Sequence, residues 1–265
     1  MNHPQIAAFA RLAMEDTPPR RALEGQKTKI SRTMHGFGYD PIHDEIVVTS
    51  PLTQAILIFR GGAKGEDAPV RVIQGSHTKI LGSAYGALDR VCVDPANNEI
   101  LLPIVPSGIL VFDRTANGDV APKRVLNNVR GSVAVDPVHN LLIVNSGTSM
   151  QIFDRLASGD AKPKAVIQGP KAGVASISSF QVYGPRGWII GGGSDGSICA
   201  WSVNDSGDAA PRWKIPVQKL TGYVASGIAL DPVHKELILS AAGQRVRPPS
   251  GIMNTVITFS WAEIF

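Results

Sequence analysis

The sequence predicts an all-β protein, a five-bladed β-propeller of four-stranded blades. Three observations lead to this prediction. A unit recurs along the chain, with its clearest copies starting 54 and 42 residues apart. Each unit holds short runs rich in Val, Ile and aromatic residues, separated by Asp-Pro, Ser-Gly and Gly-Asp turn signals. The runs at the two ends of the chain complement each other, so the first and last segments together make one complete unit.

The composition agrees with a β protein that has a substantial core. The 265 residues include 27 Gly and 19 Pro, which disfavours long helices and coiled coils. Hydrophobic residues make up 43% and charged residues 18%, so intrinsic disorder is not expected. No apolar run approaches the roughly 18 residues that a membrane-spanning helix needs. Cys92 and Cys199 lie inside apolar runs, so we expect two buried thiols and no disulfide framework.

The repeat is most regular between residues 131 and 169, where its four runs can be named in order. Run A covers residues 131–136, run B 141–145, run C 150–155 and run D 163–169. The centres of runs A to C are apolar on both faces, as expected for strands packed between neighbouring blades. Run A ends in an Asp-Pro turn in four of the copies: Asp40-Pro41, Asp94-Pro95, Asp136-Pro137 and Asp231-Pro232. Runs A and B begin near residues 37, 90, 132, 178 and 227, which gives five blades.

The two chain ends predict how the propeller closes. Residues 15–25 match residues 65–75 as a D run with no A or B run before it, whereas residues 226–265 supply A, B and C runs with no D run. We therefore expect residues 17–25 to pair as the outermost strand of the last blade, which removes the free sheet edges. Residues 1–16, although they contain a segment similar to a C run, are predicted to form a short N-terminal helix with its apolar side chains on one face. Residues 17–265 are then expected to form a single β-propeller domain.

These repeats resemble NHL-repeat β-propellers and the wider family of six-bladed, lactonase-like propellers. The resemblance rests on the A-run Asp, the B-run Leu-Ile-Val and the C-run Ile-x-Val-Phe-Asp, over about residues 15 to 265. It implies the fold and little about function, because propellers host unrelated activities. The chain departs from the family in having five repeats and no regular charged residue in the B–C loop. Lactonase-like members bind a divalent metal at inner strand ends, where this chain offers only Asp89, so we expect no metal and no other cofactor.

Several motifs have a structural explanation. The Asp-Pro-x-His motif could suggest metal ligands, but its copies fall at equivalent points of different blades, and an Asp that caps a turn explains it. Gly191–Ser197 lacks the Lys-Ser/Thr and helix of a phosphate loop and is expected to be a hairpin. No serine lies in a Gly-x-Ser-x-Gly motif, so no nucleophilic triad is predicted. The copies of the first motif are Asp40/His43, Asp136/His139 and Asp231/His234.

A charge asymmetry is the main functional signal. In a propeller the A–B and C–D loops share one face, and the B–C and D–A loops share the other. By this assignment the turn aspartates lie on the first face and most loop cations on the second. Two D–A loops repeat each other, at residues 25–30 and 75–80. The predicted ligand-binding residues are Lys29, His35, His77, Lys79, Arg130, Lys171, Arg245 and Arg247.

These features favour a non-catalytic binding or scaffold propeller that recognises a protein or another anionic partner through its basic loop face. It would act as a monomer or as a subunit of a complex. Nucleic acid is less favoured, because the net charge is only +4 and few aromatic residues accompany the cations. The absence of a signal peptide favours a cytoplasmic location. The alternative function is a lyase or hydrolase of lactone-like molecules, which requires His35, His77 or Asp89 to converge at the channel mouth.

Overall fold

The computed structural model describes residues 5–31, 36–80, 90–104, 108–175, 177, 180–243 and 254–265. The chain divides into two compact units, Met1–Val125 and Leu126–Phe265. Both consist of antiparallel sheets, and α1 (Val217–Thr221) is the one α-helix among the described residues. The all-β prediction is confirmed, and five repeat sheets give the chain the fold class of a five-bladed β-propeller. That residues 17–265 form a single domain stays a prediction.

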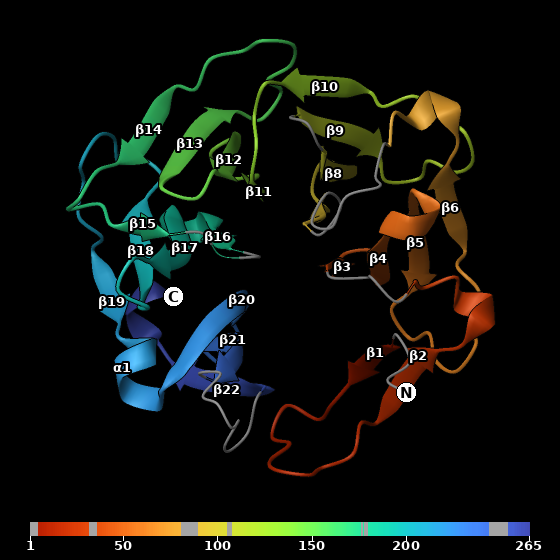
Figure 1. The fold of residues 1–265 in the computed structure, drawn as a ribbon, viewed down its shortest axis with the longest axis horizontal. Coiled ribbons are helices and arrows are strands. Elements are labelled where there is room, and N and C mark those ends of the chain that lie inside the picture. Colours follow the sequence, from red (N-terminus) through yellow and green to blue (C-terminus); the bar gives the residue numbers. More distant parts are fainter. Residues whose placement is uncertain are drawn as a thin grey trace. The chain divides into compact units, whose positions relative to one another are not determined.

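The first unit contains a two-stranded hairpin and two repeat sheets, and the last strand of the second sheet, β10, continues into the second unit at Leu126 (Figure 1). In repeat 1 the strands lie side by side in the order β3-β4-β5-β6, and repeat 2 has the order β7-β8-β9-β10. These strands follow the predicted runs A, B, C and D. The elements are β1 (Gln5–Ala8), β2 (Arg21–Glu24), η1 (Gln26–Thr28), β3 (Phe37–Asp40), β4 (Glu45–Ser50), η2 (Pro51–Thr53), β5 (Ala55–Arg60), β6 (Arg71–Gln74), η3 (Ser76–Thr78), β7 (Cys92–Asp94), β8 (Glu99–Ile104), β9 (Gly108–Asp113) and β10 (Arg124–Asn127).

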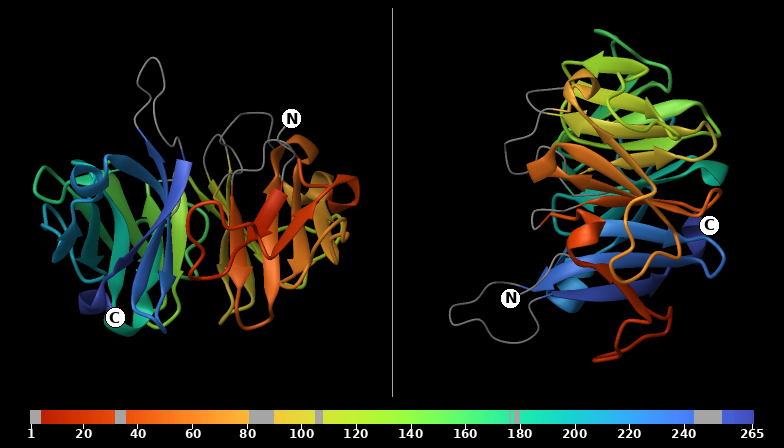
Figure 2. Two further views of the ribbon diagram at one scale, coloured as in Figure 1. Left: turned by 90° about the horizontal axis from the view of Figure 1, so that it is seen from below. Right: turned by 90° about the vertical axis from the view of Figure 1, so that its right-hand side faces the viewer.

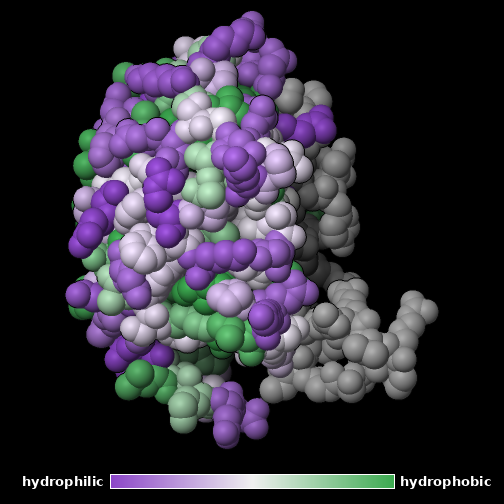
Figure 3. Space-filling model, turned by 90° about the vertical axis from the view of Figure 1, so that its left-hand side faces the viewer, coloured by the Kyte–Doolittle hydropathy of each residue, from purple (hydrophilic) through white to green (hydrophobic). Residues whose placement is uncertain are grey.

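The second unit contains repeats 3, 4 and 5. Repeat 3 is β11-β12-β13-β14, and repeat 4 has two short strands, β15 and β16, in place of one A strand. The side of this unit that Figure 3 presents carries mostly hydrophilic side chains. The elements are β11 (Ser132–Asp136), β12 (Leu141–Asn145), β13 (Ser149–Asp154), β14 (Ala165–Gln168), β15 (Val174–Ala175), β16 (Gln181–Tyr183), η4 (Gly184–Arg186), β17 (Trp188–Gly193), β18 (Ile198–Ser202), β19 (Trp213–Ile215), β20 (Tyr223–Asp231), β21 (Glu236–Gly243), β22 (Asn254–Ser260) and η5 (Ala262–Ile264).

The B and C strands form the core of both units. Every residue of β4 is buried, as is every residue of β5 except Arg60, which matches the expectation of strands covered on both faces. Repeat 5 differs, because β20 and β22 are largely made of exposed and partly buried residues, with Ile228 buried in β20 and Val256 of β22 69% exposed. The largest fully buried side chain, Trp201 of β18, donates its indole N–H to the Ala172 carbonyl at 3.1 Å. The single polar group of this buried side chain therefore has a hydrogen-bond partner.

Consecutive repeats are joined by a short parallel bridge. The middle residue of a D strand pairs with a glycine in the C–D loop that follows it in the chain: Leu23 with Gly65, Ile73 with Gly118, Leu126 with Gly159, and Ile167 with Gly207. At the second bridge the N–H of Gly118 donates to the Val72 carbonyl at 2.7 Å, and the Gly118 carbonyl accepts from Gln74 at 3.1 Å. All four glycines have positive φ, from 56° to 81°, which glycine adopts most readily. The bridging D-strand residues are at most 1% exposed.

The Asp-Pro turns between A and B strands are capped as predicted. Asp136 accepts hydrogen bonds on Oδ1 from the backbone N–H groups of Val138 and His139, at 3.0 and 3.1 Å. Its Oδ2 lies 2.7 Å from Nδ1 of His139. Asp40 with His43 and Asp231 with His234 repeat these bonds, and repeat 2 uses Asn97 in place of the histidine. The motif is therefore a turn cap that also uses the histidine side chain.

Two predictions about the N-terminus are wrong. Gln5–Ala8 is a strand rather than part of a helix, because Ile6 pairs with Leu23 of β2 and packs on the core of the first unit. Tertiary pairing here outweighs the helix propensity of an alanine-rich segment. The strand expected to pair with residues 17–25 is also wrong, because β1 of the same unit takes that place among the described residues. The antiparallel partner of β2 is β1, and β20, β21 and β22 form a sheet of three strands.

The two cysteine thiols and the helices bear on reactivity and on membrane insertion. Cys92 and Cys199 form no disulfide with each other; Cys199 is buried, and desolvation raises the pKa of its thiol to about 11, which makes it a poor nucleophile. Cys92 is only partly buried, which is less than the sequence suggested. Across the described ranges, no helix has the length and apolar character that crossing a bilayer requires.

The turn caps lead to a stability prediction. Asp136→Ala removes an acceptor that is fully buried and leaves two backbone donors without partners, so we expect a loss of about 3 kcal/mol in the free energy of unfolding. Asp231→Ala should cost less than Asp136→Ala, because that side chain is 22% exposed and water can replace it. Urea unfolding of both variants measures the difference. Equal losses would contradict the role assigned to burial.

Candidate functional site

The two predicted basic loops in the first unit have the same backbone. In each, a 3-10 turn (η1 or η3) follows a glycine, and a buried threonine closes it: Thr28 Oγ1 donates to the Gly25 carbonyl at 2.6 Å, and Thr78 Oγ1 to the Gly75 carbonyl at 2.7 Å. Figure 2 shows both turns toward the same side of the sheets of this unit. The lysine after each threonine is exposed. The sequence repeat at residues 25–30 and 75–80 is therefore a structural repeat.

Both of these lysines lie in the left-handed region of backbone space. Lys29 has φ 59° and ψ 11°, and Lys79 has φ 59° and ψ 13°. Glycine and asparagine adopt this conformation more easily than lysine does. The backbone of these turns therefore gives no local reason for a lysine at either position.

The basic loops are not free of acids, which corrects the predicted separation of charges. Asp119 accepts the N–H of His77 at 2.7 Å, and its other oxygen lies 2.7 Å from Nδ1 of the same histidine. Asp208 likewise accepts from the N–H groups of Lys171 and Ala172, at 2.7 and 2.8 Å. The parallel bridge explains this, because it brings the acid that follows each bridging glycine to the loop after the D strand. C–D loop acids thus lie beside D–A loop cations.

The predicted ligand-binding residues fall into three groups. Lys29, His77 and Lys79 are exposed in the first unit, and Arg130 and Lys171 are exposed in the second. His35, Arg245 and Arg247 lie outside the described residues. The ammonium groups of Lys29, Lys79 and neighbouring Lys27 make no hydrogen bond or ion pair with the described part of the chain, whereas Arg130 does have a polar contact.

The enzymatic alternative requires three side chains to converge, and only His77 is among the described residues. Asp89 and His35 lie outside the described residues. His77 is exposed, and its Nδ1 is held by Asp119, whose own pKa this hydrogen bond keeps below the usual range of a carboxyl group. The contacts with Asp119 hold the backbone and the imidazole of His77 within the loop. The convergence of His35, His77 and Asp89 stays a prediction.

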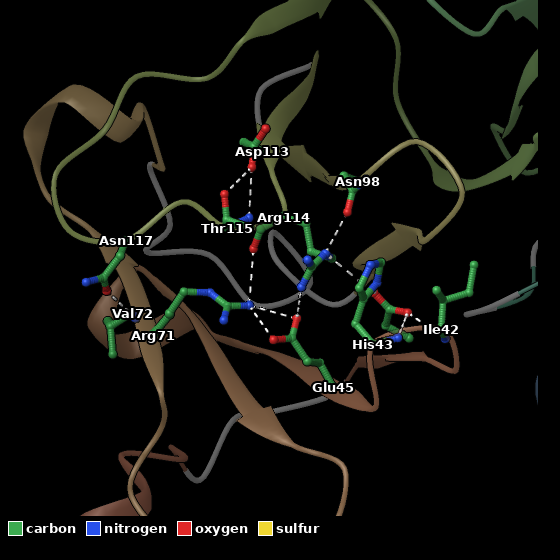
Figure 4. Close-up of polar contacts among 11 residues, drawn as sticks. Ile42, His43, Glu45, Arg71, Val72, Asn98, Asp113, Arg114, Thr115 and Asn117 are labelled. Atoms are coloured by element: carbon green, nitrogen blue, oxygen red, sulfur yellow. Dashed lines mark hydrogen bonds and ion pairs between the residues drawn. The ribbon is translucent and has the colours of Figure 1, made fainter.

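A buried ion network lies at the other end of the strands, and the sequence analysis missed it (Figure 4). Glu45, at the start of β4, accepts Nη2 of Arg71 at 2.8 and 2.7 Å on its two oxygens. Arg114, from the C–D loop of repeat 2, donates Nη1 to the same carboxylate at 2.8 Å. Glu45 therefore joins two repeats. Glu99 and Arg124 form the same pair in repeat 2, with N–O distances of 2.6 and 2.7 Å. In both repeats a Glu begins run B and an Arg begins run D, and this recurring pattern is the sequence signal for the ion pair.

One cluster in the second unit has the residue types of a metal site. One ligand atom from each of Asp231, His234 and Glu236 lies within 4.8 Å of the others. The Asp–His half of this cluster is the turn cap that repeats 1 and 3 also contain. The turn therefore accounts for the close approach of these two side chains.

Two cavities accompany these features. One of about 420 Å³ lies in the first unit beside the ion network and is lined by His43, Asp44, Glu45, Arg60, Val70 and Arg71. The other, of about 240 Å³, lies in the second unit between the Gly192–Ile198 hairpin, the residue Gln218 of α1 and the start of β20. The first is lined by charged groups and the second by glycine, serine and aliphatic residues.

The ion network predicts a large effect of one substitution. Glu45→Gln should lower the free energy of unfolding by about 3 to 5 kcal/mol, because two guanidinium groups that are at most 20% exposed lose their shared carboxylate. Glu15→Gln, at an exposed position, serves as the control and should stay within about 0.5 kcal/mol of the parent. Denaturant unfolding monitors both. A loss in Glu45→Gln no larger than in the control would show that the network does not stabilise the fold.

The His77–Asp119 pair predicts a change in titration. In His77→Ala the pKa of Asp119 should rise toward its ordinary value, because the largest cause of its lowering is the hydrogen bond from this histidine. A depressed carboxyl pKa gives stability that is present above the ordinary pKa and lost as pH falls through the lowered one. Carbon-13 NMR of the carboxyl groups measures this. Asp113, whose pKa is lowered mainly by the Thr115 hydroxyl, should not move.

Comparisons with known proteins support the fold alone. No protein-family model matches the chain, and no curated protein matches its sequence, so membership of the NHL-repeat family is not confirmed. Among solved structures, the chain is similar to a chain of the "Crystal Structure of Mitotic Checkpoint Complex", with a TM-score of 0.55 and 14% identity. The match covers 83% of this chain and 63% of that one, so it spans less than two thirds of the solved chain. At this identity the similarity extends to the propeller fold.

Proposed function

We propose that this protein is a non-catalytic binding propeller that holds an acidic surface of a partner protein through the D–A loops of its first unit. The observation that carries the proposal is the repeated lysine in the left-handed conformation, Lys29 and Lys79. An uncommon backbone conformation that recurs with the same side chain is a reason to consider function.

The charge state of these loops supports the proposal. Lys27, Lys29 and Lys79 are exposed and keep their ammonium groups unpaired within the described residues, so they are available to an incoming anion. At the opposite end of the strands, Arg71 and Arg114 already share the carboxylate of Glu45. Cations without an internal partner contribute little to stability, and they contribute to association rate and specificity instead.

A protein partner is favoured over a nucleic acid. Sites that bind single-stranded nucleic acid combine cations with aromatic side chains on which bases stack. The described parts of these two loops, residues 25–30 and 75–80, contain no aromatic residue. The solved structure with a similar fold is a chain of a protein complex, which agrees with a scaffold role while naming no partner for this chain.

Charge reversal tests the proposal with poly-L-glutamate as the acidic probe and double-stranded DNA as the alternative. The variant Lys27→Glu/Lys29→Glu/Lys79→Glu should bind poly-L-glutamate on the order of tenfold more weakly, and its residual binding should be less sensitive to salt. The matched control is Lys64→Glu/Lys162→Glu/Lys235→Glu, which changes the net charge equally at exposed lysines, one of which, Lys235, also has positive φ. Its binding should stay close to that of the parent.

The melting temperatures of both triple variants should remain near the parent value, because exposed charges contribute little to stability. If the two variants lose affinity equally, net charge rather than these loops determines binding, and the proposal is wrong. Tighter binding of DNA than of poly-L-glutamate at the same ionic strength would instead assign the loops to nucleic acid.

A further inference from the structure

The 420 Å³ cavity of the first unit lies where repeat 1 departs from repeats 2 and 3. It is bounded by the end of β5, the start of β4 and the start of β6. The strand registers align these positions between repeats: Glu45 pairs with Arg60, Glu99 with Asp113, and Leu141 with Asp154. Arg60 therefore occupies the position that holds an aspartate in repeats 2 and 3.

In those two repeats the aspartate forms an ion pair across the start of the D strand. Lys123 Nζ lies 3.7 Å from Asp113 Oδ2, and Lys164 Nζ lies 3.0 Å from Asp154 Oδ2. The backbone N–H of each lysine donates to the C strand, at 2.7 Å in both cases, and Val70 makes the same bond to Ile58 at 2.8 Å. Val70 is thus the residue of repeat 1 at the lysine position. Repeat 1 has replaced both members of the pair.

This double replacement leaves a cation without an anion. The side chain of Arg60 is exposed and has no hydrogen bond or ion pair with the described residues. Val70 is shorter than the lysine it replaces, and its side chain is 44% exposed on the cavity wall. The cavity therefore combines an unpaired guanidinium with an exposed aliphatic surface.

The carboxylates on the cavity wall do not neutralise Arg60. Glu45 already accepts three hydrogen bonds, from Arg71 and Arg114. Asp44 accepts the hydroxyl of Tyr39 at 2.8 Å and forms no ion pair with Arg60. A guanidinium presents a planar fork of donors that matches a carboxylate, so the group that would complete this site has that geometry.

We propose that this cavity binds a carboxylate carried on a short aliphatic chain, with Arg60 holding the carboxylate and Val70 contacting the chain. The ligand takes the place that the aspartate–lysine pair fills in repeats 2 and 3. A phosphate dianion fits less well, because Asp44 and Glu45 line the same cavity and would repel its second charge. The site is independent of the lysine loops, which belong to the opposite strand ends.

Butyrate is the probe, and NMR of the Arg60 side chain and the Val70 methyl groups reports on binding. We expect saturable shifts of both residues with a Kd of about 10 mM or tighter, in the range that one charged contact and a small apolar contact supply. Butylamine and butanol should produce no saturable shift, because they lack the carboxylate. Inorganic phosphate should bind more weakly than butyrate.

Two variants distinguish loss of butyrate binding from loss of stability. Arg60→Gln should weaken butyrate binding at least tenfold. Arg60→Asp/Val70→Lys installs the pair found in repeats 2 and 3, so it should keep the melting temperature and abolish binding. The control Arg20→Gln removes an exposed arginine that does not line the cavity and should bind as the parent does. The triple lysine variant should also bind butyrate normally, which separates failure of this inference from failure of the proposed function.

The absence of saturable butyrate shifts in the parent protein would overturn the inference. Unchanged affinity in Arg60→Gln, or retained binding in the double variant with its new ion pair, would overturn it as well. Tighter binding of phosphate than of butyrate would reject the carboxylate assignment.

Discussion

The parallel bridge between a D strand and the next C–D loop is the contact on which the rest of the structure depends. A single blade sheet is apolar on both faces and is stable only if a neighbour covers each face. The bridge fixes four D strands, β2, β6, β10 and β14, against the following repeat through backbone hydrogen bonds, as at Val72 and Gln74 with Gly118. It needs positive φ at the bridging residue, which explains why glycine recurs there in four successive C–D loops. The bridge also places the acidic residue that follows each glycine beside the D–A loop, as with Asp119 at His77.

The two ends of the strands are stabilised differently, and this difference separates the turn-capping carboxylates from the exposed lysines. At the A–B end, buried carboxylates hold turn N–H groups, histidines and arginines, so charge there is internally balanced around Asp40, Asp136 and Glu45. At the D–A end, threonine hydroxyls close the turns and the lysines remain exposed. Removing a buried, bonded charge costs folding energy, whereas an exposed lysine can be changed freely.

Departures from the repeat give information about function in addition to that of the repeated lysines in the D–A loops. Positions that agree in several repeats, such as the turn aspartate and the bridging glycine, are explained by folding. Arg60 and Val70 differ from their counterparts in repeats 2 and 3 without a folding reason, since an aspartate and a lysine fit the same backbone there. Repeat 5 departs in another way, because its three strands include the exposed Val256 in β22. A fold shared by many unrelated functions makes such local differences the useful signal.

The sequence by itself determined the strand content, the repeat boundaries and the Asp-Pro turns, because these depend on short-range patterns of apolar residues and turn formers. The sequence predicts a helical segment over residues 1–16, since the alanine-rich composition there carries no sign that Leu23 lies opposite Ile6. The placement of Asp119 beside His77 and of Arg114 beside Glu45 was likewise decided only by the tertiary structure. These side chains are 42 and 69 residues apart in sequence. Contacts of that separation depend on how one repeat packs on the next, and local sequence patterns do not contain that information.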